Sequence, residues 1–342
     1  MSDKMINQLT MNEPEIYCYT IYGFLFSIAK EKDMPWIYSN FIQLMYHNDW
    51  KMPIFEDHIN VFVDCPFLQS SSMRFKGDAD DFTNTIIDAI DRNYYCYLFL
   101  DWYYINDSYH GDHFAHTAVI SGYDRTKGVF SAYDNFDNGK FVKKEIPFDI
   151  TSKAFFASKT SMTGNAEDND QSDAFSYLSD IIFVNYNEFA YTKIDYNRII
   201  YLLESYLNCE NIIYTLDDKS SVYGMDVYNR LDKELKTKPY DHKKDLHLIY
   251  EHKLLMVKRL EKILDTESNS ELIEEYKNFS QEFLILRNLY LKLCIKKADS
   301  EQMSTINTKL QELAIRDKEF MKRILSAVRN HRPRTPHHRS SF

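Results

Sequence analysis

The stretch His116-Thr-Ala-Val-Ile-Ser-Gly-Tyr-Asp124, followed by Tyr133-Asp134-Asn135, decides how this chain folds. The apolar run after His116 is typical of a buried strand, and the turn between Asp124 and Gly128 predicts a return along a second strand. Asp134 follows His116 by 18 residues, which is the reach of one hairpin. Two neighbouring antiparallel strands therefore place the Asp134 carboxylate beside the His116 imidazole, where it can orient the ring.

Outward from this hairpin, apolar periodicity predicts an α+β protein in which helices come first, then an antiparallel meander, then a helical region. Before residue 190, helices are expected over 17–29, 36–47 and 82–92, and strands over 60–67, 94–105, 129–134, 141–148 and 180–185. Beyond Asp195 the expected helices are 195–208, 223–236, 242–265, 270–297 and 300–328.

This pattern divides the chain into three regions. Residues 1–190 are expected to form a thiol catalytic domain and residues 191–328 a helical region packed on it. Residues 329–342 are rich in Arg and His with two Pro, and are expected to be a disordered tail. The polar run 163–173 is expected to be a surface loop.

Composition excludes several classes of function. With only 8 Gly and no GxGxxG or GxxxxGK[ST] pattern, a phosphate-binding loop is not expected. A net charge of −10 gives no support for nucleic-acid binding. The N-terminus carries no signal-peptide pattern, and no apolar run is long enough to span a membrane. Five scattered cysteines without a CxxC fit free thiols in a reducing cytoplasm.

Cys18 stands where the first apolar helix is expected to begin, just after Asn12-Glu13-Pro14-Glu15. A helix N-terminus and a nearby imidazolium both stabilise a thiolate, which is the nucleophilic form of cysteine. Taken alone, a free cysteine is more often a small core residue than a nucleophile. The other four cysteines have weaker claims: Cys96 in an apolar strand, Cys294 on an apolar helix face, Cys65 before a proline, and Cys209 after a helix.

The segment His110-Gly-Asp-His113-Phe-Ala-His116 offers two further histidines. Histidines at i and i+3 on an extended chain point to opposite faces, so no metal site is expected here. Packing by aromatic residues is the simpler explanation for His110 and His113, although His113 is the second candidate for a catalytic base. For His116 and Asp134, the alternative is a surface histidine and a turn aspartate.

Asn12 precedes Cys18 by six residues. Its side-chain amide can donate to an oxyanion together with the backbone N–H of Cys18. Helix capping explains an asparagine at this position equally well.

Several motifs carry a resemblance to a known group. The early Cys18-Tyr-Thr-Ile-Tyr, the His-x-Ala-Val-Ile-x-Gly-Tyr-Asp stretch from His116, and the triplet Tyr133-Asp134-Asn135 resemble papain-like and C39-peptidase-like acyltransferases of natural-product gene clusters, including the butirosin acyltransferase N-terminal family. The later stretches 223–228 and 248–253 also resemble parts of those proteins. Motif-level likeness covers roughly residues 10–150.

The resemblance implies a papain-like cysteine protease fold with Cys18 as nucleophile, His116 as base and Asp134 as the orienting acid. It also implies an oxyanion role at position 12, where the family pattern has Gln and this chain has Asn12, one methylene shorter. The implied reaction moves an acyl group from a phosphopantetheine thioester on a carrier protein to Cys18, and then to a small amine. No metal or cofactor is implied.

Two other classes remain open at this point. A C39-like cysteine peptidase uses the same three residues with water as the acceptor, and a scaffold or binding protein uses the fold without chemistry. The product distinguishes a peptidase from an amide synthetase, because one cuts a peptide and the other forms an amide. The substitution Cys18→Ala distinguishes both enzymes from a scaffold or binding protein, because only the enzymes lose activity.

Overall fold

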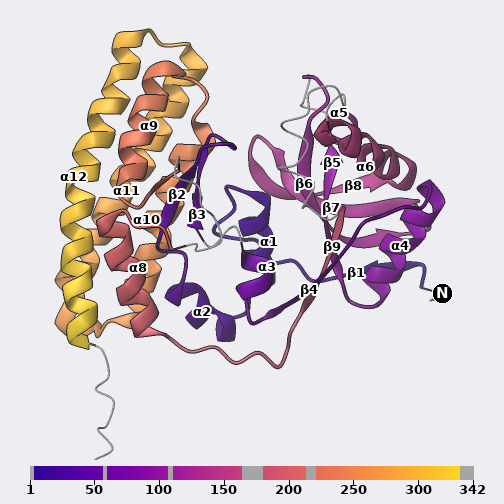
Figure 1. The fold of residues 1–342 in the computed structure, drawn as a ribbon, viewed down its shortest axis with the longest axis horizontal. Coiled ribbons are helices and arrows are strands. Elements are labelled where there is room, and N and C mark those ends of the chain that lie inside the picture. The colour runs from indigo at the N-terminus through magenta and orange to yellow at the C-terminus, as the bar shows by residue number, and fades with distance from the viewer. Residues whose placement is uncertain (1–3, 57–59, 107–110, 164–179, 213–220, 332–342) are drawn as a thin grey trace, which may run out of the picture. The chain divides into compact units, whose positions relative to one another are not determined.

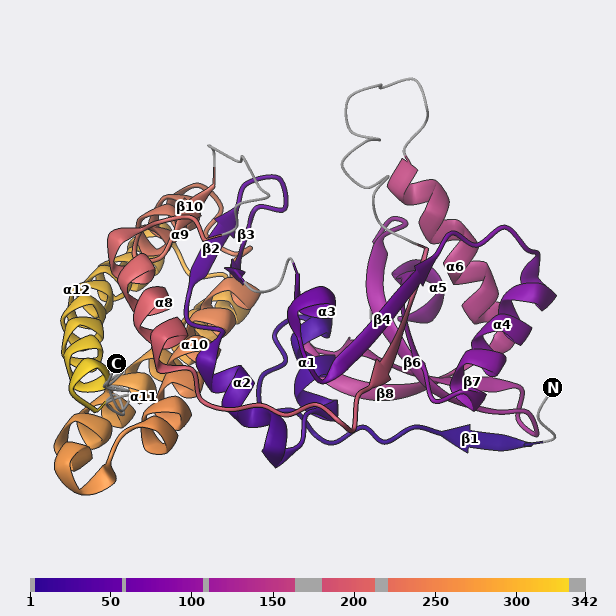
Figure 2. The same cartoon turned by 60° about the horizontal axis from the view of Figure 1, so that its bottom comes forward.

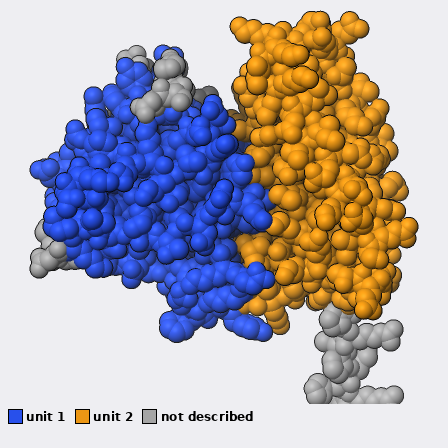
Figure 3. Space-filling model, turned by 180° about the vertical axis from the view of Figure 1, so that it is seen from behind, with its two compact units in different colours: residues 1–33, 60–191 blue, residues 34–59, 192–342 orange. Residues whose placement is uncertain are grey.

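The computed structural model describes residues 4–56, 60–106, 111–163, 180–212 and 221–331 (Figure 1). The chain forms two compact units (Figure 3), each of them discontinuous in sequence. Unit 1 comprises residues 1–33 and 60–191, and unit 2 comprises residues 34–59 and 192–342. Both contain helices and antiparallel strands, so the fold class is α+β, as the sequence predicts.

Unit 1 is built on an antiparallel sheet with the strand order β4-β9-β5-β6-β7-β8, in which β1 also pairs with β6. The strands are β1 Ile6–Gln8, β4 Leu68–Met73, β5 Tyr95–Asp101, β6 Ala115–Asp124, β7 Val129–Asp137, β8 Lys140–Pro147 and β9 Ile181–Tyr186. The helices are α1 Thr20–Ile28, η1 Glu31–Asp33, α3 Val61–Asp64, α4 Ala79–Asp91, α5 Trp102–Ile105 and α6 Phe148–Thr163.

One face of this sheet is covered by α4 and α6 (Figure 2). Helix α4 begins at a capping box, in which Asp78 accepts from the N–H groups of Asp80 and Asp81. Its apolar stripe is buried, and the Phe82 ring stacks on Phe155 of α6 with centroids 4.5 Å apart. These side chains pack against alternate residues of β5 and β6, which forms the main core of unit 1.

Helix α1 packs against the opposite face. Phe24 contacts Tyr95 and Tyr97, which alternate along β5 with residues of the main core. At Gly23 an added Cβ would lie 2.5 Å from the Phe141 ring of β8. Only glycine permits this close approach, which presses the helix that follows Cys18 onto the sheet.

Unit 2 combines a small antiparallel sheet of order β10-β2-β3 with a set of long helices. The strands are β2 Leu44–His47, β3 Met52–Phe55 and β10 Val222–Tyr223. The helices are α2 Met34–Ser39, α8 Tyr196–Asn208, α9 Asp226–Thr237, α10 Lys243–Ile263, α11 Thr266–Lys296 and α12 Ser300–His331. In the described part of the chain, no helix is both long enough and apolar enough to cross a membrane.

The segment 34–59 belongs to unit 2, whereas the sequence placed it in the first region. Arg259 of α10 is fully buried, and its guanidinium donates to the backbone carbonyls of Tyr38, Asn40 and Phe41. β2 also pairs with β10. The segment therefore completes the helical unit through contacts distant in sequence, which local patterning does not reveal.

Lys253, Asp317, Tyr206 and Tyr228 form a buried polar group in unit 2, the Asp317 cluster. Asp317 Oδ2 of α12 accepts from Lys253 Nζ of α10 at 2.7 Å. It also accepts from Tyr206 Oη of α8 at 2.9 Å and Tyr228 Oη of α9 at 3.0 Å. Burial lowers the pKa of Lys253, while the Asp317 carboxylate opposes that shift. One carboxylate thus fixes four helices relative to one another.

Some expected elements differ from the structure. The helix expected over 36–47 is instead the short α2 followed by β2, and the strand expected over 60–67 is wrong because α3 occupies Val61–Asp64. The strand expected over 94–105 ends at Asp101, where α5 begins. Helix α6 was not expected. The loop 163–173 lies largely outside the described residues.

The C-terminal tail begins later than expected. Helix α12 continues through Arg329 to His331, so the first three residues of the expected tail are helical. Residues 332–342 lie outside the described part of the chain.

Lys253→Met should lower the free energy of unfolding of unit 2 by about 3–5 kcal/mol, because it leaves the Asp317 charge buried without its partner. Denaturant unfolding followed by helical circular dichroism measures the loss. The matched control is Lys322→Met, which removes an exposed lysine from its ion pair with Glu319 and should change stability by less than about 0.5 kcal/mol. Equal effects of the two substitutions would show that the Asp317 cluster does not hold the helices.

Candidate active site

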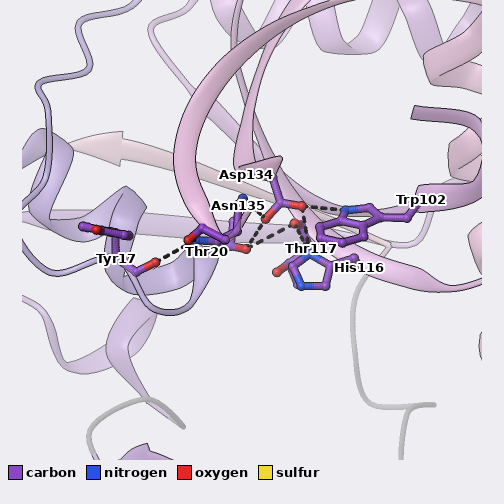
Figure 4. A network of polar contacts seen from close by, with 8 residues as sticks. Tyr17, Thr20, Trp102, His116, Thr117, Asp134 and Asn135 are labelled. Carbon is purple, nitrogen blue, oxygen red and sulfur yellow. Dashed lines mark hydrogen bonds and ion pairs between the residues drawn. The ribbon is translucent and has the colours of Figure 1, made fainter. Parts of the chain in front are cut away.

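Asp134 is the centre of a buried polar network in unit 1 (Figure 4). Its Oδ2 atom lies 2.8 Å from His116 Nδ1 and accepts from Trp102 Nε1 at 2.7 Å. Its Oδ1 atom accepts from Thr20 Oγ1 at 2.6 Å and from the backbone N–H of Asn135 at 2.7 Å. We call these five residues the Asp134 cluster. Four donors fill the acceptor capacity of a carboxylate, which compensates for removing the ion from water.

The sheet brings His116 and Asp134 together. The pairing of β6 with β7 extends from the turn to Val119, which lies opposite Tyr133. Within this pairing the register shifts between Ile120 and Gly122. His116 lies near the start of β6, and Asp134 lies within β7, one residue beyond Tyr133. The register shift puts both side chains on the same face of the sheet. Asp134 accepts hydrogen bonds when ionised, so the proton of the neutral ring lies on Nδ1 and Nε2 is the nitrogen without a proton.

Trp102 shapes the environment of this pair. Its ring lies against the His116 imidazole with centroids 4.4 Å apart, while its Nε1–H donates to Asp134. Phe114 flanks the same imidazole at 5.9 Å. The aromatic rings therefore cover the His116–Asp134 hydrogen bond and limit its contact with water.

Cys18 is tied to the Asp134 cluster through its neighbours in sequence. Tyr17 O accepts from Asn135 Nδ2 at 2.8 Å, and Thr20 donates to Asp134. Since consecutive Cα atoms are about 3.8 Å apart, these bonds hold the Cys18 backbone beside the cluster. Cys18 precedes α1 by two residues, so it stands just before the helix and not within it.

Exposure does not separate Cys18 from the other buried cysteines. Its side chain is 2% exposed, and Cys65 and Cys96 are buried as well. Burial raises the pKa of the Cys65 and Cys96 thiols far above neutrality, and it also raises that of Cys209. Position next to the Asp134 cluster is the property that distinguishes Cys18.

Asn12 is not brought to Cys18. Its backbone N–H donates to Ser27 O, in the last turn of α1. Ser27 lies seven residues beyond Thr20, which is roughly 10 Å along the helix axis at 1.5 Å per residue. The Asn12 backbone therefore lies beside the end of α1 that is remote from Cys18, which disfavours the expected oxyanion role.

His113, the second candidate for a base, has a carboxylate of its own. Its Nδ1 atom lies 2.6 Å from Asp101 Oδ2, at the end of β5. His110 lies outside the described residues. Over the residues that the structure describes, no group of three His, Cys, Asp or Glu side chains is arranged to hold a metal ion.

Sequence reasoning missed Thr20, Trp102, Asp101 and Tyr97 as members of this region. Burial raises the pKa of Tyr97, which hydrogen-bonds Thr117. Thr20 follows Cys18 by two residues, and Trp102 follows a buried aspartate at a strand end. Neither position in the sequence indicates that the residue contacts Asp134, which is more than 30 residues away from each of them.

Comparison of the chain with models of known protein families and with curated proteins finds no match.

Thr20→Val should lower the free energy of unfolding by about 1.5–3 kcal/mol, because a hydrogen bond to a buried carboxylate is lost while the side-chain volume is kept. Thr20→Ser retains the hydroxyl and is the matched control. Chemical denaturation of both variants measures the difference. Equal stabilities would mean that the Thr20–Asp134 bond contributes nothing to the fold.

Proposed function

We propose that this chain is a cysteine-dependent acyltransferase that forms amide bonds, with unit 1 as a papain-like thiol domain. The observation that carries the proposal is the Asp134 cluster, in which one buried carboxylate binds both the His116 imidazole and the segment around Cys18. A thiol beside an oriented imidazole is the arrangement needed for nucleophilic acyl transfer.

The first half-reaction loads the enzyme. The Cys18 thiolate attacks the carbonyl of an acyl thioester carried on the phosphopantetheine arm of a carrier protein, and His116 returns its proton to the departing thiol. Asp134 holds the imidazole in the required tautomer and stabilises its charged form. The backbone N–H of Cys18 and the N-terminal turn of α1 are the oxyanion donors in place of Asn12.

The second half-reaction releases the product. A small amine attacks the Cys18 thioester, His116 Nε2 accepts a proton, and the amide leaves as the thiolate is regenerated. Exchange between thioesters is nearly balanced in free energy, and amide formation from a thioester is downhill, so no nucleotide is required. Trp102 and Phe114 beside His116 support this reaction by limiting the access of water.

We infer a setting in cytoplasmic natural-product assembly of the nonribosomal-peptide type. The five cysteines are free thiols, as expected in a reducing compartment. The natural-product setting and the carrier partner follow from the motif resemblance at Cys18, His116 and Tyr133–Asn135.

Cys18→Ala should abolish acyl-enzyme formation. The wild-type protein incubated with N-acetylcysteamine thioesters should gain one acyl mass on Cys18, detected by intact-protein and peptide mass spectrometry. Cys96→Ala is the control, because burial keeps the Cys96 thiol protonated and its loss should leave the adduct unchanged. An adduct that persists in Cys18→Ala would exclude the proposed nucleophile.

His116→Ala and Asp134→Asn should each lower the rate of acyl transfer by about 10²–10⁴-fold, since the base is lost in the first variant and wrongly oriented in the second. Single-turnover kinetics with product analysis gives the rate and the product. Amide from thioester and amine supports the synthetase, whereas predominant hydrolysis with amine present, or peptide cleavage, supports a peptidase. Unchanged turnover of His116→Ala would contradict the proposed base.

A further inference from the structure

A second histidine–carboxylate pair lies close to the first. Asp101 is fully buried, and its Oδ2 atom lies 2.6 Å from His113 Nδ1. Its Oδ1 atom accepts from the backbone N–H groups of Tyr103 and Phe114, both at 3.1 Å. The carboxylate is thus fixed by three donors from two segments. A single capping bond would suffice to begin α5, so the His113 contact is an addition to the cap.

The His113 ring is accessible while its partner is not. The His113 side chain is 53% exposed, and Asp101 has no exposed surface. Because Asp101 holds Nδ1, Nε2 is the nitrogen that a solute can reach as a proton acceptor. His113 therefore combines the orientation of a catalytic imidazole with access from solvent, a combination that His116, which is mostly buried, does not have.

Aromatic rings of α5 line this second pair. The Tyr103 ring lies 4.5 Å from the His113 ring and is 54% exposed, and Tyr104 lies 5.5 Å away. Tyr104 already has a cation on its face, because Lys153 Nζ lies 4.4 Å from its centroid. The exposed Tyr103 ring beside His113 is a surface of the same kind, which attracts an alkylammonium through the ring quadrupole.

The two pairs are adjacent along one short helix. Trp102 contacts His116, and the next residue, Tyr103, contacts His113. His113 precedes His116 by three residues, which corresponds to roughly 10 Å of extended chain. His113 and His116 therefore both lie against the first residues of α5, with their α-carbons no more than roughly 10 Å apart.

The proposed reaction removes two protons from the amine. An alkylamine has a pKa near that of lysine, about 10, so it arrives as an ammonium without a lone pair. It must lose one proton before it attacks and another as the amide forms. His116 can accept only one of these protons, because it must be neutral when the amine attacks.

We propose that His113, oriented by Asp101 and flanked by Tyr103, is the site that binds a primary alkylammonium and deprotonates it. The neutral His113 Nε2 takes one proton, giving a free amine and a His113 imidazolium that later returns this proton to water. The amine lone pair then attacks the Cys18 thioester carbonyl, the C–S bond breaks, and His116 takes the second proton. This assignment rests on the proposed acyltransferase function.

The test uses two acceptors that differ in protonation. Full-length enzyme is first acylated with an N-acetylcysteamine thioester, and then mixed with propylamine, which is protonated at neutral pH, or hydroxylamine, which is mostly neutral. His113→Gln should slow transfer to propylamine by at least about 10²-fold, the usual contribution of a general base. Transfer to hydroxylamine and the loading of Cys18 should remain as in the wild type.

Asp112→Asn is the matched control, because it changes an exposed neighbour of His113 on the same segment. It should leave the rate of transfer to either acceptor unchanged.

Two results with His113→Gln would overturn the amine site. Equal slowing of transfer to both acceptors would assign His113 a structural role, and unchanged transfer to both would show that His113 takes no part in the reaction. His113→Asn serves as a second variant if the first does not fold by circular dichroism. Failure of wild-type Cys18 to load overturns the acyltransferase, and the amine site with it, whereas normal loading with equal slowing overturns the amine site alone.

Discussion

The structure of unit 1 depends on one buried carboxylate. Asp134 is removed from water entirely, and this is tolerable only because Thr20, Trp102, His116 and the Asn135 N–H all donate to it. These donors come from the start of α1, the start of α5 and strands β6 and β7. Satisfying one ion therefore fixes the position of four segments, and the segment that contains Cys18 is among them.

The same physical device organises unit 2. Asp317 is buried as completely as Asp134, and it is compensated by Lys253 and two tyrosine hydroxyls from three other helices. A buried ion of this kind contributes less net stability than apolar packing, but it permits few alternative arrangements of its partners. In unit 1 the partners surround a histidine that can exchange protons. In unit 2 they are a lysine and tyrosines, which makes that cluster structural.

Much of the fold was predictable because local sequence is sufficient for it. Strands β6 and β7 and the long helices α8 to α12 follow from apolar periodicity, with boundaries shifted by a few residues. The failures occurred where contacts distant in sequence outweigh local pattern. The sequence predicts a helix over 36–47 and assigns 34–59 to the first region, yet contacts with Arg259 and β10 make 34–59 part of unit 2.

The sequence by itself determined the α+β class and the hairpin that carries both His116 and Asp134. The register shift between Ile120 and Gly122, which the local pattern does not specify, puts the two side chains on the same face of the sheet. The positions of Cys18, Asn12 and Trp102 were decided only by tertiary structure. Gly23 lets α1 pack closely on the sheet, and Thr20 anchors the Cys18 segment at Asp134. The backbone hydrogen bond from Asn12 to Ser27 places Asn12 beside the last turn of the helix. A spacing of six residues along the chain does not specify this separation, because the path between Asn12 and Cys18 is set by packing and not by local geometry.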